Sequence, residues 1–361
     1  MRSNKVLVSA LVGAALIATS CSGGDGSAQG DTLPPAGSSS RPSSPAKTPP
    51  AAKRPIILAF GGDVHFEGML RSRLADPATA LGPISGTLRR ADLSMVNLET
   101  AITTGGTPAP GKQFTFRAPA TAFTALRQSG VDVVSMANNH GMDYMESGLN
   151  DSLQAIKRTR FPTVGIGRNA DDAYKPYRVT VKGNRLAIIG ATQVLDDHLI
   201  SAWTATDAKG GLASAKNVTR MVQAVREARK GSDAVIVHLH WGGELEPCPL
   251  PRQQELAEQL VQAGADVIVG GHAHIPLGGG FLRGRYVHYG LGNFVFYSAN
   301  GQTANSGVLL LRLQGRKVTK AAWKPARISG GLPRLMSGSA AQAELTRWNG
   351  LRRCTGLTAT P

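Results

Sequence analysis

The stretch from Pro55 to His65, which reads PIILAFGGDVH, decides how the rest of the chain is interpreted. Its first six residues form a continuous apolar run, typical of a buried strand, and the glycine pair that follows predicts a tight turn. Asp63 and His65 come directly after that turn. An acidic side chain and an imidazole at the end of a buried strand indicate a candidate site there.

Similar apolar runs recur along the chain and alternate with stretches of helical pattern. Runs rich in β-branched residues, and too short for buried helices, lie at 93–96, 131–134, 186–189, 234–239, 267–269 and 286–289. Helices are expected at 120–128, 142–158, 215–229 and 252–263, with Gly130 and Gly264 ending two of them. This alternation predicts an α/β fold whose sheets are largely buried.

Polar side chains that can bind a metal follow five of these strands. In chain order the sets are Asp63 with His65, Asn97-Leu98-Glu99, Asn138-Asn139-His140, His240-Trp241-Gly242-Gly243-Glu244 and Gly270-Gly271-His272-Ala273-His274. In open α/β sheets the loops beyond the carboxyl ends of strands converge on one crevice, so these distant sets can meet in space. The sequence therefore predicts a single site built from five segments.

The residue types in these sets favour a first-row divalent metal. Five of the eight histidines in the chain belong to the sets, and a mixture of His, Asp, Glu and Asn suits Mn, Fe or Zn better than Ca or Mg. Seven plausible ligands are too many for one ion. Two ions about 3.5 to 4 Å apart that share a carboxylate would use them, activating a water and polarising the group it attacks.

The order of these motifs resembles that of the calcineurin-like metallophosphoesterases. The variants Gly-Asp at 62–63, Asn-Leu-Glu at 97–99, Asn-Asn-His at 138–140, His-Trp-Gly-x-Glu at 240–244 and the Gly-Leu-Gly-Asn-Phe ending at Phe294 resemble its CapA, or poly-γ-glutamate capsule protein, branch. The resemblance covers about 55–324. It implies a sandwich of two mixed β-sheets flanked by helices.

Carried over residue by residue, the resemblance implies two metal sites. The first would be held by Asp63, His65 and His274 and the second by Asn139, His240 and His272, with Glu99 bridging them. The family usually bridges with Asp, so the longer Glu99 departs from its pattern. Many CapA-like sequences lack a histidine at the place of His65, and its presence favours a working pair of metals. His140, next to a metal-bound asparagine, would be the acid that stabilises or protonates the leaving group.

Several of these residues also have plain structural interpretations. Taken alone, Asp63, Asn138 and Asn139 would be turn residues, His238 is expected to be a core or supporting histidine, and His198 and His288 structural. Candidate substrate contacts are Arg117, Trp241, Glu244 and Asn293. For Arg117 the alternative is a surface salt bridge, for Trp241 a packed aromatic and for Asn293 a turn cap.

The ends of the chain predict export. Residues 1–20 have the layout of a signal peptide, and Cys21 after small residues resembles a lipidation site; ordinary cleavage with Cys21 as a bystander is the alternative. Residues 21–54, rich in Pro, Ser and Gly, are expected to form a disordered tether.

The main domain is expected at 55–335, with a helical segment at 336–361 packed on it. In an oxidising compartment Cys248 and Cys354 are expected to form a disulfide, with Cys248 as a metal ligand or nucleophile the rival interpretation.

Charge and family resemblance together suggest a role at the cell surface. The formal net charge of +16 is spread along the chain, which favours an anionic polymer or membrane surface over nucleic acid. We expect a lipoprotein on the outer face of the membrane that acts with capsule synthesis and export proteins. One hypothesis is a two-metal hydrolase of phosphoester or related bonds; the other is a non-catalytic polymer-binding or assembly component.

Overall fold

A computed structural model describes residues 53–361 of the chain. The expected signal peptide, Cys21 and nearly all of the tether lie outside these residues. None of the helices within 53–361 combines the length and the apolar character that crossing a membrane requires.

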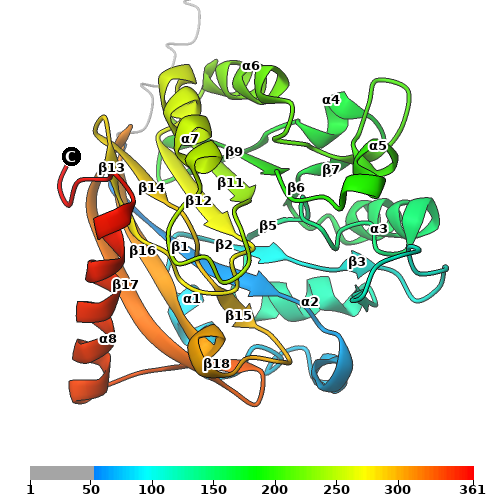
Figure 1. The fold of residues 1–361 in the computed structure, drawn as a ribbon, viewed down its shortest axis with the longest axis horizontal. Helices are drawn as coiled ribbons and strands as arrows, with labels where there is room; N and C mark the ends of the chain where they lie inside the picture. Colours follow the sequence, from blue (N-terminus) through cyan, green and yellow to red (C-terminus); the bar gives the residue numbers. More distant parts are fainter. Residues whose placement is uncertain (1–52) are drawn as a thin grey trace, which may run out of the picture. The chain divides into compact units, whose positions relative to one another are not determined.

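The first of two large sheets is mixed and contains eight strands (Figure 1). Its order is β18 (Leu332–Leu335), β17 (Lys317–Ser329), β16 (Asn305–Gln314), β1 (Ile56–Val64), β2 (Leu93–Leu98), β5 (Val133–Ser135) and β6 (Thr163–Val164), with β15 (Asn293–Val295) beside the end of β1. Strands β1, β2, β5 and β6 are parallel, whereas β16, β17 and β18 run antiparallel to their neighbours.

The second large sheet contains six strands and is also mixed. Its order is β13 (Gly279–Leu282), β14 (Arg285–His288), β12 (Val267–Gly271), β11 (Ala234–His240), β9 (Asn184–Thr192) and β8 (Tyr177–Val181). The four central strands are parallel, and the two edge strands are antiparallel to them. Two short pairs complete the strands: β3 (Ala101–Ile102) with β4 (Arg117–Ala118), and β7 (Ile166–Gly167) with β10 (Gly211–Leu212).

Helices pack around both sheets, and the last of them packs against the apolar cluster between the sheets rather than on an outer face. They are α1 (Ser85–Leu88), α2 (Thr121–Gln128), α3 (Met145–Thr159), α4 (Ala170–Ala173), α5 (Ile200–Trp203), α6 (Val218–Arg229), α7 (Pro251–Ala263) and α8 (Gly338–Gly350). Short 3₁₀ turns lie at Gly68–Ala75, Gly82–Ile84, Asp197–Leu199, Gly301–Ala304 and Leu351–Cys354. One apolar cluster packs α2 and α3 on the first sheet, another packs α6 and α7 on the second, and a third fills the space between the sheets with side chains such as Phe60, Met95 and Ile236.

The predicted two-sheet sandwich is therefore the observed fold. Each of the seven apolar runs becomes a strand, because a side chain buried on both faces of a parallel strand leaves no room for polar alternation. The strands β16 and β17 were not expected. They form a long antiparallel hairpin. Exposed Lys and Arg residues interrupt the buried positions of β17, so it lacks a continuous apolar signal, whereas β16 contains the apolar run 308–311 and was missed despite it.

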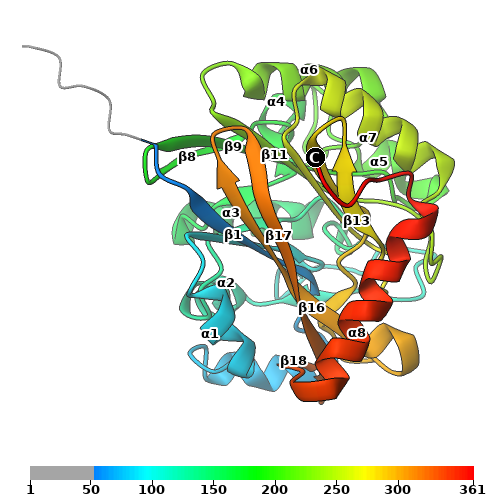
Figure 2. The ribbon, with the colours of Figure 1, turned by 90° about the vertical axis from the view of Figure 1, so that its left-hand side faces the viewer.

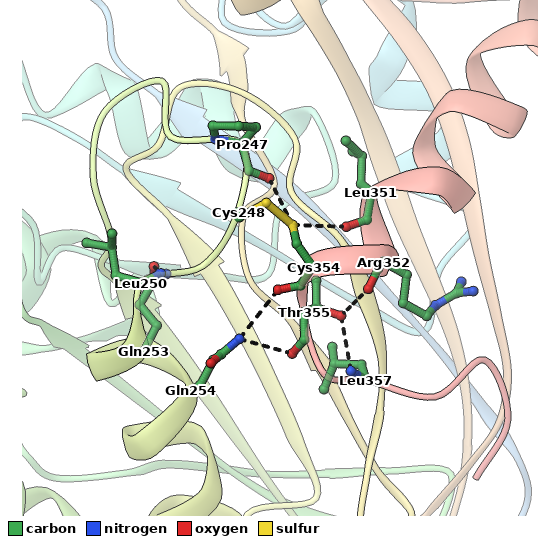
Figure 3. Close-up of a disulfide and its surroundings, with 10 residues drawn as sticks. All are labelled: Pro247, Cys248, Leu250, Gln253, Gln254, Leu351, Arg352, Cys354, Thr355 and Leu357. Carbon is green, nitrogen blue, oxygen red and sulfur yellow. Dashed lines mark hydrogen bonds between the residues drawn. A yellow bond between two sulfur atoms is a disulfide. The ribbon is translucent and has the colours of Figure 1, made fainter.

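The last helix, α8, lies along β17 (Figure 2). Trp348 on α8 stacks on Trp323 of β17 with ring centroids 5.6 Å apart. Beyond α8 the chain turns back to the second sheet, where Cys354 is bonded to Cys248, with Cα atoms 5.7 Å apart (Figure 3). The expected disulfide is thus present and joins the C-terminal segment to the loop that follows His240.

Candidate metal centre

Strand register brings the predicted site residues together at one end of the two sheets. In the first sheet Asp63 is the register partner of Asn97 on β2 and of Asn293 on β15. In the second, His240 at the end of β11 faces Gly271 at the end of β12. A distance of 3.2 Å between Asn97 Nδ2 and His240 Nδ1 joins the two sheets at this point. The carboxyl ends of the strands meet as the sequence predicts.

Asp63 lies at the base of the site and is fully buried. Its Oδ1 accepts a hydrogen bond from Asn97 Nδ2 at 2.9 Å, and its Oδ2 accepts one from the backbone amide of His272 at 3.1 Å. Burial, reinforced by the nearby charge of Glu99, raises the pKa of Asp63 to about 6. A positive ion would reverse this effect, because an opposite charge favours the ionised carboxylate.

Two buried asparagines support Asp63. Asn97 Oδ1 accepts from Asn138 Nδ2 at 3.0 Å, and Asn138 Oδ1 accepts from the backbone amide of His140 at 3.0 Å. These contacts fix which end of the Asn97 amide faces Asp63. Asn97 belongs to the set of polar residues at 97–99, but no role was assigned to it from the sequence.

The carboxylate of Glu99 occupies the middle of the site. It is fully buried, and among the described residues neither of its oxygens accepts a hydrogen bond. Its Oε1 lies 3.4 Å from His240 Nε2 and 4.0 Å from His140 Nε2. Burial raises the pKa of this carboxyl group above its ordinary value. A buried carboxylate with no donor is costly unless something positive is placed beside it.

Three groups of side chains bring ligand atoms within 4.8 Å of one another. They are Asp63 with Glu99 and His274, Glu99 with His240 and His272, and Glu244 with His272 and His274. Glu99 belongs to the first two groups, which matches its expected position between two metals. Asn139 adds an oxygen to the second group, since its Oδ1 lies 2.8 Å from His240 Nε2.

The turn that carries His272 and His274 has unusual backbone angles. The φ angles of these residues are +90° and +57°, a region that side chains other than glycine rarely adopt. A Cβ added at Gly271 would lie 2.5 Å from Asp63 Oδ1, so glycine is required for this close approach. Strained backbone of this kind clusters at functional sites. Among the described residues, His272 Nδ1 is buried without a hydrogen-bond partner.

Asn293 fixes the tautomer of His274. The amide Nδ2 of Asn293 donates to the carbonyl of Thr303 at 3.3 Å, so its Oδ1 faces His274 Nδ1 at 2.8 Å and accepts from it. The lone pair of this imidazole is then on Nε2. Burial opposes a charge on His274, but Glu99 and Asp63 outweigh it and raise its pKa. Asn293 is itself buried, so it positions a candidate ligand and does not reach substrate.

His140 is held by an acidic partner that the sequence analysis missed. Its Nδ1 lies 2.6 Å from Asp143 Oδ2, its ring stacks on Phe116 with centroids 4.1 Å apart, and its Nε2 faces Glu99. Asp143 Oδ1 forms an ion pair of 2.8 Å with Lys112, which also donates to the carbonyl of Asn139. The three-residue spacing from His140 to Asp143 was the available signal; Lys112, in a Gly- and Pro-rich loop, offered none.

Burial determines the protonation states of His140 and Asp143. It lowers the pKa of His140 well below the ordinary value, with the charge of Lys112 acting in the same direction. It raises the pKa of Asp143 to about 7, against the opposing effect of Lys112. The neutral imidazole donates from Nδ1 to Asp143, so its Nε2 is left to exchange a proton at the centre.

His65 lies apart from the three groups. Its ring is enclosed by Phe116, Phe296 and Tyr297, and its Nδ1 and Nε2 lie 3.1 and 3.3 Å from the backbone amides of Glu67 and Tyr297. Burial lowers the pKa of His65 to about 3. Both ring nitrogens thus face backbone donors in this arrangement, and the geometry does not support the role of first-metal ligand expected for it.

The side chains of two candidate substrate contacts point away from the ligand groups. Trp241 is fully buried, donates to the carbonyl of Tyr289 at 2.8 Å and stacks on that ring, so the expected substrate contact is wrong and the packed-aromatic alternative holds. The Arg117 guanidinium stacks over Tyr144, 4.8 Å from the ring centroid. Arg117 and Phe116 are consecutive, so their side chains leave the extended chain on opposite sides, and Phe116 is the one that faces the site.

The observed donor set fits divalent ions. Ligand bonds of about 2.0 to 2.2 Å place neighbouring ligand atoms about 2.8 to 3.6 Å apart in octahedral or tetrahedral geometry, and the spacings around Glu99, His240 and Asn139 are 2.8 and 3.4 Å. The unpartnered oxygens of Glu99 and the unpartnered Nδ1 of His272 supply acceptors where an ion would sit. The residues present therefore fit the metals that the motifs imply.

Comparison with known proteins gives a consistent assignment. The family model described as "Bacterial capsule synthesis protein PGA_cap" matches residues 57–298. The "Capsule biosynthesis protein CapA" of Bacillus anthracis is 32% identical over 212 residues, covering 58% of this chain and 51% of that protein. The "PGA biosynthesis protein CapA" of Bacillus subtilis (strain 168) is 32% identical over 198 residues, covering 52% and 49%. The chain spans about half the length of these curated relatives.

Solved structures with a related arrangement are more distant. A hypothetical protein from Thermus thermophilus overlaps with a TM-score of 0.48 at 16% identity, covering 76% of this chain and 100% of that one. A phosphatase from Mycoplasma pneumoniae has a TM-score of 0.46 at 12% identity, covering 81% and 98%. A 5′-nucleotidase from Candida albicans has a TM-score of 0.45 at 13% identity, covering 82% and 57%. Because these TM-scores and sequence identities are low, the chemistry of this chain has to be inferred from its own residues.

Proposed function

The chain belongs to the PGA_cap family of bacterial capsule synthesis proteins, and on that premise we propose that it is a two-metal hydrolase of a phosphoester or related bond in surface-polymer synthesis. The observation that carries the proposal is the buried carboxylate of Glu99, which has no donor among the described residues and belongs to two ligand groups at once. A structural role would leave this charge uncompensated, whereas two shared divalent ions would compensate it.

The residues divide into holders of the ions and a proton donor. One ion would be held by Asp63, Glu99 and His274, and the other by Glu99, Asn139, His240 and His272, with Mn, Fe or Zn as the expected metals. When bound, the ions would supply Lewis-acid activation of the attacking water and of the group it attacks. His140, held at Nδ1 by Asp143, has its lone pair on Nε2, so it would take up there the proton released by the attacking water and pass that proton to the leaving oxygen.

A polymer-binding role without turnover is the second candidate. The excess of basic residues, 40 Lys and Arg against 24 Asp and Glu, favours an acidic polymer under either function. The relatives are named for capsule or PGA biosynthesis. We propose an acidic surface polymer as the partner class, working with capsule synthesis and export proteins.

We also propose that the protein is exported and anchored by lipid on Cys21. The support is the sequence of residues 1–21. Replacing Cys21 with Ser should move the protein from the membrane fraction to the soluble exported fraction. Equal membrane retention of the two forms would rule out this anchor.

Turnover separates the two functions. The metal-loaded protein is assayed with a generic phosphodiester, a phosphomonoester and poly-γ-glutamate, beside a His140→Ala variant. The hydrolase account predicts cleavage of at least one substrate and a loss of about 10²- to 10⁴-fold in His140→Ala, the usual contribution of a general acid. Absence of turnover on all three, with polymer still bound, would favour the binding role.

A further inference from the structure

The third group of candidate ligands differs from the other two in exposure. His272 is buried and His274 is mostly so, but Glu244 is exposed on the loop after β11. Ligand atoms of these three residues still lie within 4.8 Å of one another. Glu244 therefore places a carboxylate on the solvent side of the two histidines that the inner groups also use.

The loop holds Glu244 in this place by several contacts. The backbone amide of Leu245 donates to the carbonyl of Ala273 at 3.0 Å, which ties the loop to the turn between the two histidines. Leu245 has a φ of +58°, a strained value for a branched apolar side chain that is itself exposed. Four residues after Glu244, the Cys248–Cys354 disulfide fixes the other end of the loop.

The charge of Glu244 acts on the centre. It favours the protonated form of both His240 and His274, although burial still holds the pKa of His240 at about 4. The same carboxylate is poorly suited to contact an anionic substrate directly, because like charges repel. Its sign suits a cation.

His272 and His274 belong both to the inner ligand groups and to the group of Glu244. A neutral imidazole offers a single lone pair, so His272 and His274 cannot serve the inner groups and a separate outer ion at the same time. Glu244 is thus placed to bind an ion that one of these histidines already holds.

We propose that Glu244 is a metal ligand on the solvent side of the centre, completing the coordination of an ion held by His272 or His274. This inference rests on the proposed two-metal function and assigns Glu244 a role different from the substrate contact expected from the sequence. It is the one carboxylate of the three groups that lies at the surface, and a substrate oxygen can replace it without any rearrangement of the buried ligands.

The test is titration of Mn²⁺ alone into the purified full chain after removal of bound metal, followed by isothermal calorimetry. Glu244→Gln and Glu244→Ala should weaken binding of one Mn²⁺ by about tenfold or more, in the range seen when support for a metal site is lost. The matched control is Glu246→Gln, which removes an exposed charge from the same loop and should change the affinity by less than about twofold. Circular dichroism of the metal-free variants checks that they fold.

The outcomes separate this inference from the function on which it rests. Two Mn²⁺ bound with unchanged affinity in both Glu244 variants would overturn the role of Glu244 and leave the two-metal centre standing. If Glu246→Gln weakened Mn²⁺ binding as much as the Glu244 variants, the effect would come from the overall charge of the loop. That result would also overturn the role of Glu244 as a ligand. A wild-type chain that binds no Mn²⁺, Zn²⁺ or Fe²⁺ would overturn the centre itself.

Discussion

The buried carboxylate of Glu99 makes the metal-free protein less stable than its packing alone would allow. Replacing it with Gln keeps the size and removes the charge, so we expect Glu99→Gln to stabilise the metal-free chain by about 1–3 kcal/mol at pH 7. The pKa of Glu99 is raised above its ordinary 4.5 by burial, so the unfolded chain ionises first as pH rises. Stability of the wild type therefore falls relative to the variant above about pH 4.5.

Thermal melting of both chains from pH 4 to 8, in the presence of a chelator, measures this effect. The difference in Tm should be small near pH 4 and grow with pH. Added Mn²⁺ should reverse the order, because the variant lacks the carboxylate shared by the two proposed sites and gains less binding energy from the ions. A variant that melts lower than the metal-free wild type at pH 7 would mean that Glu99 has a donor which the described contacts do not include.

Asp143 is expected to act through His140. Asp143→Asn keeps the contact to the Phe116 amide but loses the charge that holds the imidazole tautomer. We predict a fall in kcat of about 10- to 100-fold with the metal content unchanged, because the imidazole of His140 loses the carboxylate that holds its Nδ1 proton. Loss of metal together with activity would instead place Asp143 among the groups that hold the ions.

Motif order predicted most of the residues that come together at the candidate centre, and it did not predict the direction of two side chains. Asp63, Glu99 and His240 follow strand ends, and register alone brings such residues together. The position of the His65 ring depends on the aromatic side chains that enclose it, two of which lie more than 200 residues away. Trp241 follows a predicted ligand, yet its indole packs on the far side against Tyr289. No local pattern encodes either choice.

Among the elements, short buried strands were predictable and the amphipathic hairpin was not. Strand β11 is apolar on both faces until His238, which gives a clear signal. Strand β17 interrupts its buried positions with exposed Lys and Arg residues and includes Pro325, which lowers its β signal. It pairs with β16 in antiparallel register along nearly the whole length of β16. No pattern within the sequence of β17 alone predicts this pairing.

The disulfide links two elements and supplies the next prediction. It closes a loop with a sequence separation of 106, which contributes up to about 4–5 kcal/mol through the entropy of the unfolded chain. The double variant Cys248→Ser/Cys354→Ser avoids a free thiol and should lower the Tm. It should also weaken metal binding, since the bonded Cys248 lies on the loop of Glu244. Calorimetric melting measures the Tm, and Mn²⁺ titration measures the metal affinity. If neither changed in the double variant, the disulfide would not stabilise the fold or hold the loop of Glu244 in place.

Across the molecule, the centre depends on two sheets that meet at their carboxyl ends. Asp63 and Asn97 come from one sheet and His240 and His272 from the other, with Glu99 between them. Continuous apolar runs predicted the parallel strands of both sheets, and the family resemblance implied that the strands form two mixed sheets. The sequence could not predict how the sheets are aligned across the interface, because that alignment is set by packing of side chains such as Phe60 and Ile236.

Counting the divalent ions bound to each chain tests the central claim most directly. The purified full chain is loaded with Mn²⁺, freed of excess metal and measured by inductively coupled plasma mass spectrometry, beside His240→Ala and His140→Ala. We predict two ions per wild-type chain, one in His240→Ala and two in His140→Ala, because His240 is proposed as a ligand and His140 as the group that transfers a proton. One ion or none in the wild type, or equal loss in both variants, would contradict a shared two-metal centre.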